Sequence, residues 1–326
     1  MGNIFAERIE ALRNMMADNG WDAVVITGSD PHSSEYQAPR WKQVEWLTGF
    51  TGEAGDVVVT ADHAGLWTDS RYFIQALDQL EGTGVELHKT RVPGAVPIPQ
   101  WLSDKARVVA VDGLCQSVSA VKELEEVLGE GGLVVDVPDM LQELWHDRPQ
   151  IPVTPVTTLD VECFGGIPRF EKISWLRKWM LVQGYDKVLL SSLDEVVWML
   201  NVRGSDIEYN PLVISYLLVS QDYVKWFVKK SVVDSELDPD TLDSFDELRM
   251  DGVDVEDYDA VFFALSDFGE DADSGVIFID PSTLNANVHK YISGCFPPDS
   301  VVCGTSPVIL EKSVKTESEI VGMRQT

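Results

Sequence analysis

The sequence predicts an α/β protein with two related domains in tandem, each a mixed, largely parallel sheet flanked by helices. Three observations support this fold class. Short β-branched runs alternate with segments of helical periodicity, which is typical of parallel strands joined by helices. A segment near the N-terminus recurs 164 residues later with the same order of elements. The length of 326 residues suits about two domains of ordinary size.

The internal repeat is the strongest of these observations. Residues 7–24 and residues 171–188 share a helix with Ile and Leu on one face, a methionine, and then Gly-Trp-Asp or Gly-Tyr-Asp before a β-branched or aliphatic strand. Gly20 and Gly184 follow the two helices, where glycine is the usual terminator. Chance is a poor explanation for agreement at so many positions, so we interpret the chain as two sibling domains.

The first domain is predicted to span residues 1–150. Strands separated by helices predict a largely parallel sheet, with an antiparallel hairpin over residues 56–68. The predicted helices are at about 4–19, 70–80, 117–128 and 139–146, and the predicted strands at about 23–27, 56–60, 64–68, 85–89, 107–111 and 132–135.

A proline-rich linker is predicted over residues 151–168, because prolines lack a backbone donor and favour extended chain. The second domain then spans residues 169–311 and repeats the plan of the first more loosely. Its predicted helices are at about 169–183 and 194–200, and its predicted strands at about 187–192, 213–219, 223–229, 275–279 and 301–302.

The last residues carry a helix start. Thr316 stands three residues before Glu319, which is the spacing of a capping box, and Ile320 and Met323 follow at helical spacing. A helix that is capped and then ends has little to pack against. A frayed tail is the alternative. We expect residues 312–326 to be the start of a truncated C-terminal domain.

The stretch around residues 49–73 contains the most distinctive local pattern. Gly49, Gly52 and Gly55 have the spacing G-x-x-G-x-x-G and precede a strand, so they favour a tight turn over a dinucleotide-binding loop. Asp69 and Ser70 are expected to cap the following helix.

Arg71 therefore lies where a strand ends and a helix begins. Open α/β sheets place their ligand contacts at such positions. An isolated arginine is more often a surface or ion-paired residue, so the residues alone leave its role open.

The charge of the chain excludes one class of partner. The formal net charge is −29 and the sequence pI is about 4.3, so a nucleic acid backbone would be repelled. Residues 234–273 hold sixteen acidic side chains against one basic side chain, Arg249. This stretch is interpreted as a solvated acidic face, with a docking surface for a basic partner as the alternative.

The cysteine pattern and the N-terminal residues predict a cytoplasmic protein. The four cysteines are Cys115, Cys163, Cys295 and Cys303, which form no zinc pattern and no disulfide-rich framework. Residues 2–10 resemble an amphipathic helix and not a signal peptide. No apolar run reaches the roughly 18–20 residues of a membrane span, so we expect no membrane association.

Local catalytic motifs are missing from the sequence. None of the five histidines forms an H-E-x-x-H pattern, and no G-x-S-x-G elbow is present. The closest approaches to a metal pattern are His32 with Glu35 and His63 with Asp62, both in predicted turns. We therefore predict no catalytic residue, no metal ligand and no cofactor in this chain.

Taken together and in order, the motifs resemble the first two domains of the three-domain Xaa-Pro aminopeptidases (aminopeptidase P), which belong to the creatinase/prolidase N-terminal-domain family. Each motif alone is weak, but the ordered set covers nearly the whole chain. The motifs are residues 31–36, 49–55, 67–73 and 145–149 in the first domain, 193–195 and 198–211 in the second, and 312–324 at the end.

This resemblance implies a function as well as a fold. In the family, a metallopeptidase domain would follow residue 326 and hold two Mn(II) ions through two Asp, one His and two Glu. The metal-bound hydroxide there cleaves the bond before a penultimate proline. None of those ligands lies in this chain, so we expect it to be inactive alone, while shaping and restricting access to the active site.

Site residues and partners can be carried over in the same way. The arginine that contacts the bound peptide in the family corresponds to Arg71, and a guanidinium suits a carboxylate or carbonyl. Arg203, Asp206 and Asn210 are expected to be structural, in a polar turn that holds the second domain against its neighbours. The implied partners are the chain's own C-terminal catalytic domain, short peptides with proline second, and a second copy in a full-length homodimer.

Two functional hypotheses remain open at this point. In the first, the chain is the non-catalytic half of a cytosolic proline-specific exopeptidase. In the second, it is a peptide- or histone-binding module of the same architecture, as in relatives without metals. The acidic stretch 234–273 gives the second some support, because basic tails would be attracted to it.

Overall fold

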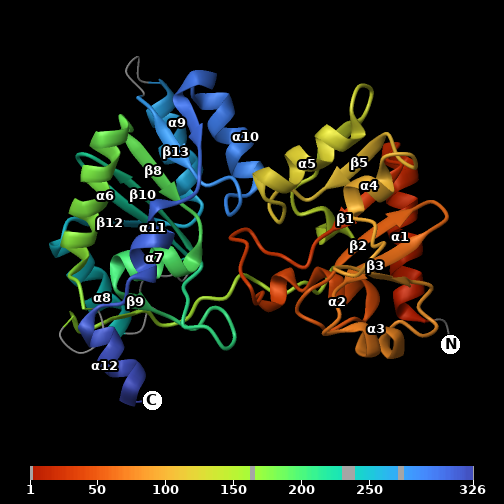
Figure 1. Cartoon of the computed structure of the whole chain (residues 1–326), viewed down its shortest axis with the longest axis horizontal. Coiled ribbons are helices and arrows are strands. Elements are labelled where there is room, and N and C mark those ends of the chain that lie inside the picture. Colours follow the sequence, from red (N-terminus) through yellow and green to blue (C-terminus); the bar gives the residue numbers. More distant parts are fainter. Residues whose placement is uncertain (1–2, 162–165, 230–238, 271–274, 326) are drawn as a thin grey trace. The chain divides into compact units, whose positions relative to one another are not determined.

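The computed structural model describes residues 3–161, 166–229, 239–270 and 275–325. The chain divides into two compact units. The first comprises Met1–Gln150 with Asn285–Asn287, and the second comprises Ile151–Leu284 with Val288–Thr326. Each unit contains one six-stranded sheet flanked by helices (Figure 1). The α/β fold class with two sheets of mostly parallel strands is therefore confirmed.

In the first sheet, five strands run in one direction and only β2 runs against its two neighbours. The strand order is β4-β3-β2-β1-β5-β6, so the predicted antiparallel hairpin is the pair β2–β3. The strands are β1 (Ala23–Ile26), β2 (Asp56–Thr60), β3 (Ala64–Thr68), β4 (Glu86–Lys89), β5 (Val108–Val111) and β6 (Leu133–Asp136).

Both faces of the first sheet are covered. Val24, Val59 and Leu66 point to a core that α1 and α2 close, whereas Val25 and Trp67 point to the core under α4 and α5. Alternation of side chains along each strand produces this division. The helices are α1 (Ile4–Asn19), α2 (Gln43–Thr48), α3 (Phe73–Gln79), α4 (Ile98–Leu102) and α5 (Val118–Leu128), with 3₁₀ turns η1 (Pro39–Trp41) and η2 (Met140–Glu143).

The second sheet has the same topology as the first. Its order is β12-β11-β10-β8-β13-β14, and only β10 is antiparallel to its neighbours. The strands are β8 (Lys187–Leu190), β10 (Ser215–Ser220), β11 (Val224–Val228), β12 (Val253–Asp257), β13 (Ile277–Ile279) and β14 (Val301–Cys303); β7 (Thr157–Thr158) and β9 (Val202–Arg203) form a separate pair.

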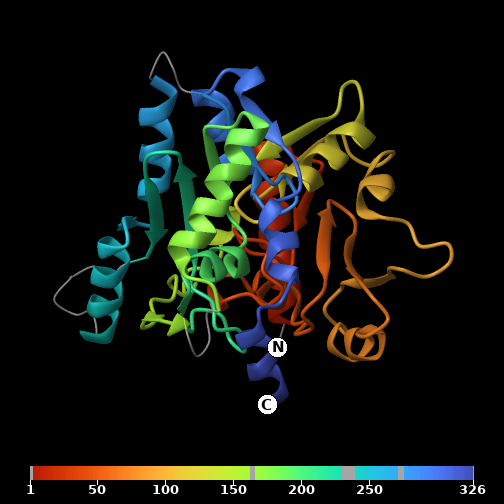
Figure 2. The ribbon, with the colours of Figure 1, turned by 60° about the vertical axis from the view of Figure 1, so that its left-hand side comes forward.

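The helices of the second half include α6 and α7, which pack on β10, and α8 and α9, which contact β12 (Figure 2). The acidic stretch thus contains α8, β12 and α9 among its described residues. The bounds are α6 (Arg169–Gln183), α7 (Leu193–Leu200), α8 (Pro239–Met250), α9 (Ala260–Glu270), α10 (Ala286–Cys295), α11 (Pro307–Ser313) and α12 (Glu317–Gln325), with 3₁₀ turn η5 (Pro298–Ser300).

The sequence repeat corresponds to repeated local structure. Gly20 at φ 70° and Gly184 at φ 77° end α1 and α6 in the left-handed region, with backbone N–H groups returning to the last helical turn. Asp22 and Asp186 then accept backbone N–H groups at the start of β5 and just before β13. In both units, therefore, the same residue types end the helix and bond to the parallel strand beside the one that follows the helix.

The predicted cap at residues 316 and 319 is confirmed. The backbone N–H of Thr316 donates to the Glu319 carboxylate at 2.7 Å, and the Glu319 N–H donates to Thr316 Oγ1 at 3.3 Å. This reciprocal pair is a capping box at the start of α12.

Two local predictions are wrong. The helix predicted at 139–146 is the short 3₁₀ turn η2, which begins after Asp139 in a left-handed conformation at φ 60°. Asp69 and Ser70 do not cap α3, whose N-cap is Tyr72 without a side-chain hydrogen bond. The carboxylate of Asp69 binds Arg71 instead. Caps and ion pairs use the same residue type, so the sequence alone does not separate them.

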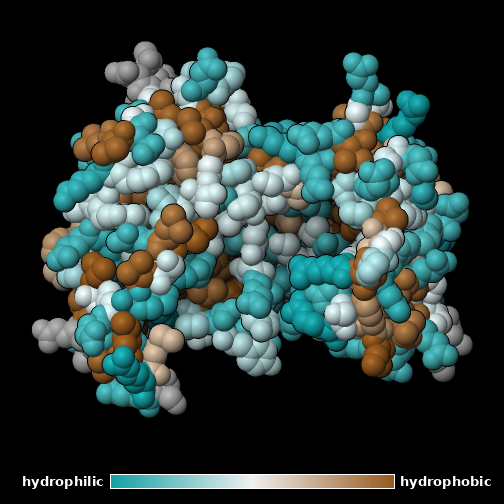
Figure 3. All heavy atoms as spheres, in the orientation of Figure 1, coloured by the Kyte–Doolittle hydropathy of each residue, from teal (hydrophilic) through white to brown (hydrophobic). Residues whose placement is uncertain are grey.

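Hydrophilic side chains dominate the visible face, where hydrophobic ones occur in small groups (Figure 3). Several large hydrophobic side chains are exposed, as is usual for a globular protein. They include Ile74, Val182, Met250 and Phe263.

Candidate functional site

The carboxyl ends of the parallel strands define one edge of the first sheet. β1, β3, β4, β5 and β6 all end there, and the oppositely directed β2 begins there. Open α/β sheets bind ligands at this edge. Asp56, Asp69 and Asp112 lie here, and each accepts a hydrogen bond from a backbone N–H of an edge loop. Each carboxylate therefore fixes one loop of this edge, and Asp69 fixes the loop that carries Arg71.

Arg71 lies three residues beyond β3 and is held by Asp69. Arg71 Nη2 donates to Asp69 Oδ2 at 2.8 Å, and Arg71 Nε donates to Oδ1 at 3.0 Å. The Arg71 backbone N–H also donates to Oδ1, at 3.1 Å. Hydrogen bonding to Arg71 lowers the pKa of Asp69 to about 2, so the pair stays ionised at neutral pH.

The pair has one buried and one exposed member. The Asp69 side chain is 9% exposed, whereas the Arg71 side chain is 60% exposed and lies beside the Tyr72 ring. One face of the guanidinium fork is thus committed to Asp69. Nη1 makes no hydrogen bond to any described residue and can donate to a ligand.

The glycine-containing loop 49–55 packs against the start of α3. A Cβ on Gly52 would lie 2.2 Å from the Phe50 ring and 2.8 Å from the Tyr72 ring, so only glycine fits there. Gln79 Nε2 donates to Thr51 Oγ1 at 2.8 Å, which ties the loop to the helix. The predicted tight turn is therefore a close-packed loop beside Arg71.

A second close approach fixes the other side of this loop. A Cβ on Gly28 would lie 2.5 Å from the carbonyl oxygen of Gly55, so the two glycines allow the backbones to touch. The Gly28 N–H donates to Asp56 Oδ1 at 3.1 Å. Burial raises the pKa of Asp56 to about 6, because its charged form loses water.

A groove of about 490 Å³ adjoins the loop. Thr51 and Gly49 line it on the loop side, and Trp46, stacked on Trp145 with centroids 5.2 Å apart, forms an aromatic wall. The Arg8 guanidinium lies 4.5 Å from the Trp46 ring centroid. The groove thus offers an aromatic wall beside the loop, and Arg71 is not among the residues that line it.

The second unit contains the three residues predicted to be structural. Asp206 is buried and accepts hydrogen bonds from Thr154 Oγ1 at 2.7 Å and from the Ile214 N–H at 2.8 Å. Burial raises its pKa. Arg203 Nη1 donates to the carbonyl of Val202 at 3.0 Å, and the backbone of Asn210 bonds within the same turn.

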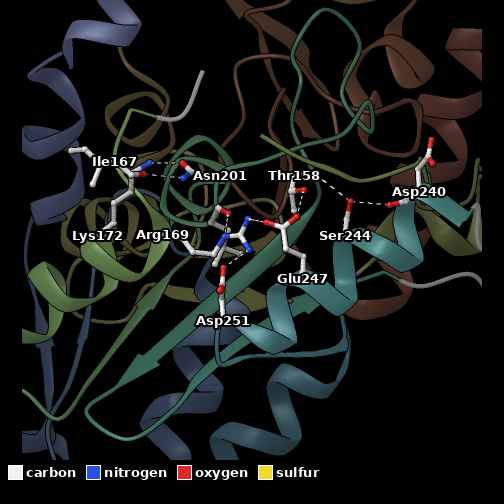
Figure 4. A network of polar contacts seen from close by, with 10 residues as sticks. Thr158, Ile167, Arg169, Lys172, Asn201, Asp240, Ser244, Glu247 and Asp251 are labelled. Carbon is white, nitrogen blue, oxygen red and sulfur yellow. Dashed lines mark hydrogen bonds and ion pairs between the residues drawn. The ribbon is translucent and has the colours of Figure 1, made fainter. Parts of the chain in front are cut away.

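A larger polar network of the second unit connects α6, α7 and α8 (Figure 4). Buried Arg169 donates to Glu247 at 2.8 Å, to Asp251 at 2.9 Å and to the carbonyl of Leu200 at 2.9 Å. No sequence motif suggested this set, because its members come from three separate helices. It binds the helices to one another and leaves its own donors satisfied.

The neighbouring Lys172 belongs to the same region (Figure 4). Its Nζ donates to Asn201 Oδ1 and to the carbonyl of Trp198, both at 2.6 Å, and lies 4.1 Å from the Trp198 ring centroid. Burial lowers the pKa of Lys172 to about 8. Asn201 ends α7 at φ 54° and donates to the carbonyl of Ile167.

The family that the sequence resembles has a dinuclear metal centre. Within the described ranges, no group of side chains matches that centre. Such a centre requires bridging carboxylates. Among the described residues, a single group of three metal-ligand side chains comes together: His63, Glu86 and His88, with one carboxylate. Sequence reasoning paired His63 with Asp62 and missed His88, which the register of β3 and β4 brings close.

Comparison with known families divides the chain as its two units do. The creatinase/prolidase N-terminal domain matches residues 8–144 and, through a second family description of the same domain, residues 147–319. The second match covers more than half of the 326 residues.

Relatives with assigned names match along nearly the whole chain. Xaa-Pro aminopeptidase 1 of Dictyostelium discoideum is 31% identical over 99% of this chain and 51% of the relative. Aminopeptidase P2 of Arabidopsis thaliana is 29% identical over 98% of this chain and 48% of the relative. The chain therefore spans about half the length of these curated relatives.

A solved structure is also similar along nearly the whole chain. X-prolyl aminopeptidase from Caenorhabditis elegans, described as a cytosolic enzyme with a di-nuclear active site, superposes with a TM-score of 0.88. It is 30% identical, and the match covers 98% of this chain and 53% of that one. Within the described residues, no helix of this chain is long and apolar enough to cross a membrane.

Proposed function

The chain belongs to the creatinase/prolidase N-terminal domain family, and from this premise we propose that it is the non-catalytic N-terminal part of a proline-specific metalloaminopeptidase. The substrate would be a short peptide with proline at its second position, and the residue before that proline would be released. Catalysis would belong to a C-terminal domain with two Mn(II) ions, in a cytoplasmic enzyme that can form a homodimer.

The match to Xaa-Pro aminopeptidases over 98–99% of the chain carries this proposal. The relatives are about twice as long, which supports a further domain as the partner of this chain.

Within this function, Arg71 would contact the peptide. Asp69 fixes one side of the guanidinium and leaves Nη1 to donate to a peptide carbonyl or carboxylate. Preorganisation by Asp69 reduces the entropy lost when the peptide binds. Arg203, Asp206 and Asn210 would stabilise the second unit, and the hydrogen bonds of buried Asp206 support that role.

Kinetics of the full-length protein, carrying its catalytic domain, test the role of Arg71. We expect Arg71→Ala to reduce kcat/KM by about tenfold or more, equivalent to about 1.4 kcal/mol of lost binding. The melting temperature should fall slightly, because the nearly buried Asp69 carboxylate loses its ion pair and keeps the backbone N–H of residue 71. Arg71→Lys should restore part of the loss by keeping the charge without the fork.

Arg91→Ala is the matched control. Arg91 reaches Asp69 only at 3.9 Å and its side chain is 83% exposed, so its loss changes the same local charge without removing the held fork. We expect nearly normal kinetics for this variant. Unchanged kcat/KM in Arg71→Ala would remove Arg71 from the substrate site.

A peptide- or histone-binding module remains the second candidate, because one stretch of the second unit is strongly acidic. Basic tails would be attracted to such a surface, more strongly at low salt. Salt-dependent binding of basic peptides by a full-length protein without peptidase activity would favour this candidate. Within the described part of the acidic stretch, the exposed carboxylates are Asp240, Asp243, Asp246, Asp251, Asp254, Asp259 and Asp267.

A further inference from the structure

Two imidazoles and a carboxylate converge on the face of the first sheet that α4 and α5 cover. His63 directly precedes β3, and Glu86 and His88 lie on β4. The parallel register pairs Gly65 with Glu86 and Trp67 with His88, so alternate residues of both strands share this face. His63 Nε2 and His88 Nε2 are 3.0 Å apart, and a Glu86 carboxylate oxygen completes a group within 4.8 Å.

Aromatic side chains hold the two imidazoles in place. The His88 ring stacks on Trp67, with centroids 3.8 Å apart and planes at 9°. The His63 ring lies against Trp101 of α4, with centroids 4.9 Å apart. The rings are thus fixed from outside, and their Nε2 atoms face one another.

Gly65 makes room for this arrangement. A Cβ at that position would lie 2.7 Å from His63 Nε2 and 2.7 Å from the Cδ2 atom of His88. Any other residue would push the imidazoles apart. Because Gly65 has no side chain, the Nε2 atoms of His63 and His88 can approach each other.

The spacing of the two nitrogen atoms suits a shared metal ion. Zinc–imidazole bonds of about 2.0–2.1 Å at tetrahedral angles place two nitrogen ligands about 3.3 Å apart. The observed 3.0 Å differs from this value by a few tenths of an ångström, which small ring rotations would supply. A hydrogen bond with one shared proton would also suit the pair of nitrogen atoms, but it assigns no role to the carboxylate.

The position of Glu86 favours a shared metal ion over a shared proton. Its side chain is exposed and forms no hydrogen bond or ion pair with a described residue, yet it lies with the imidazoles. A carboxylate beside two imidazoles adds the negative charge that a divalent cation requires. Two nitrogen ligands and one oxygen ligand suit zinc and similar transition metals better than calcium or magnesium, which prefer oxygen alone.

We propose that His63, Glu86 and His88 form a zinc-binding site that fastens the edge strand β4 to β3. Three protein ligands leave one position for water, and the exposure of Glu86 provides the entry path. β4 is otherwise a partly exposed edge strand held on one side by β3.

Zinc titration of the chelator-treated chain tests this proposal, with Zn²⁺ alone as the probe. We expect one ion bound per chain by calorimetry, and a melting temperature that rises with free zinc because the ion binds the folded state. His88→Phe should weaken binding by at least tenfold while keeping the stack on Trp67. His63→Gln and Glu86→Gln should also weaken it, the latter less.

Matched controls change the same residue types elsewhere in the first unit. His146 and Glu81 are both exposed and lie outside the group of three ligands, so His146→Gln and Glu81→Gln should bind zinc like the wild type. If His88→Phe fails to fold, the other two variants carry the test.

Two results would overturn the proposal. Failure of the wild-type chain to bind zinc would identify the imidazoles as a pair sharing a proton. Binding that is equal in wild type, His63→Gln and Glu86→Gln would assign zinc to another part of the chain.

Discussion

Individual buried carboxylates in this protein have raised pKa values. Glu195 on α7 is almost fully buried and accepts a hydrogen bond from Ser306 Oγ at 2.6 Å. Burial is the main cause that raises its pKa to about 7, and the charges of Asp194 and Asp280 contribute to that rise. The folded state therefore holds this proton more tightly than the unfolded chain, whose glutamate pKa is about 4.3.

The first prediction concerns Glu195→Gln. A raised folded-state pKa contributes stability below the unfolded pKa, and that stability is lost as pH rises from about 4.3 to about 7. The variant keeps a neutral group, so it should unfold with a free energy about 1–3 kcal/mol higher than wild type at pH 8. The difference should become small at pH 5. Urea unfolding at both pH values measures it.

Glu171→Gln is the control, because Glu171 is an exposed glutamate of the same unit. It should leave stability nearly unchanged at both pH values. Lower stability of Glu195→Gln than wild type at pH 8 would contradict the burial argument.

The residue scale also shows what sequence reasoning can find. The stops at Gly20 and Gly184 depend on neighbours within one helical turn, so they were predictable. The contact of His63 with His88 depends on the parallel register of β3 and β4, which joins residues 25 apart. Nothing local in the sequence specifies that register.

Among the elements, the helices of the second unit depend on one buried arginine. Arg169 opens α6, and its guanidinium reaches Glu247 of α8, Asp251 just after α8 and the last carbonyl of α7 (Figure 4). Its side chain is 4% exposed, whereas Glu247 and Asp251 are nearly half exposed. The three helices therefore meet at this side chain.

The second prediction concerns the replacement of Arg169 by methionine. Arg169→Met should lower the free energy of unfolding by about 2–4 kcal/mol, because it removes both ion pairs and leaves the Leu200 carbonyl without its donor. Amide hydrogen exchange should increase most in α8. Denaturant unfolding and exchange mass spectrometry supply the two measurements.

Arg249→Met on α8 is the control. Arg249 forms an exposed ion pair with Asp246 one turn away, and such pairs contribute little. We expect a change within about 0.5 kcal/mol. Equal destabilisation by the two variants would mean that the buried network has no special role.

At this scale, the sequence predicted the features that depend on residues close together in the chain. The repeat, the hairpin β2–β3 and the capping box of α12 involve near neighbours or regular periodicity, and each was predicted. The η2 turn was predicted as a longer helix, because the left-handed backbone of Asp139 leaves little trace in the sequence. The Arg169 network joins residues about 80 apart and was not anticipated.

At the scale of the whole molecule, two units of one topology form a chain about half as long as its curated relatives. Both units match the same domain family, which supports the interpretation of the repeat as a duplication. This organisation supports the proposal that the two units assist a reaction that a further domain would carry out.

The most direct test of that role is peptide hydrolysis by the 326-residue chain alone, with added Mn(II) and an Xaa-Pro peptide as substrate. The account predicts no release of the N-terminal residue by this chain, and turnover by the full-length protein under the same conditions. Turnover that stays with the purified chain through successive chromatographic steps would contradict it.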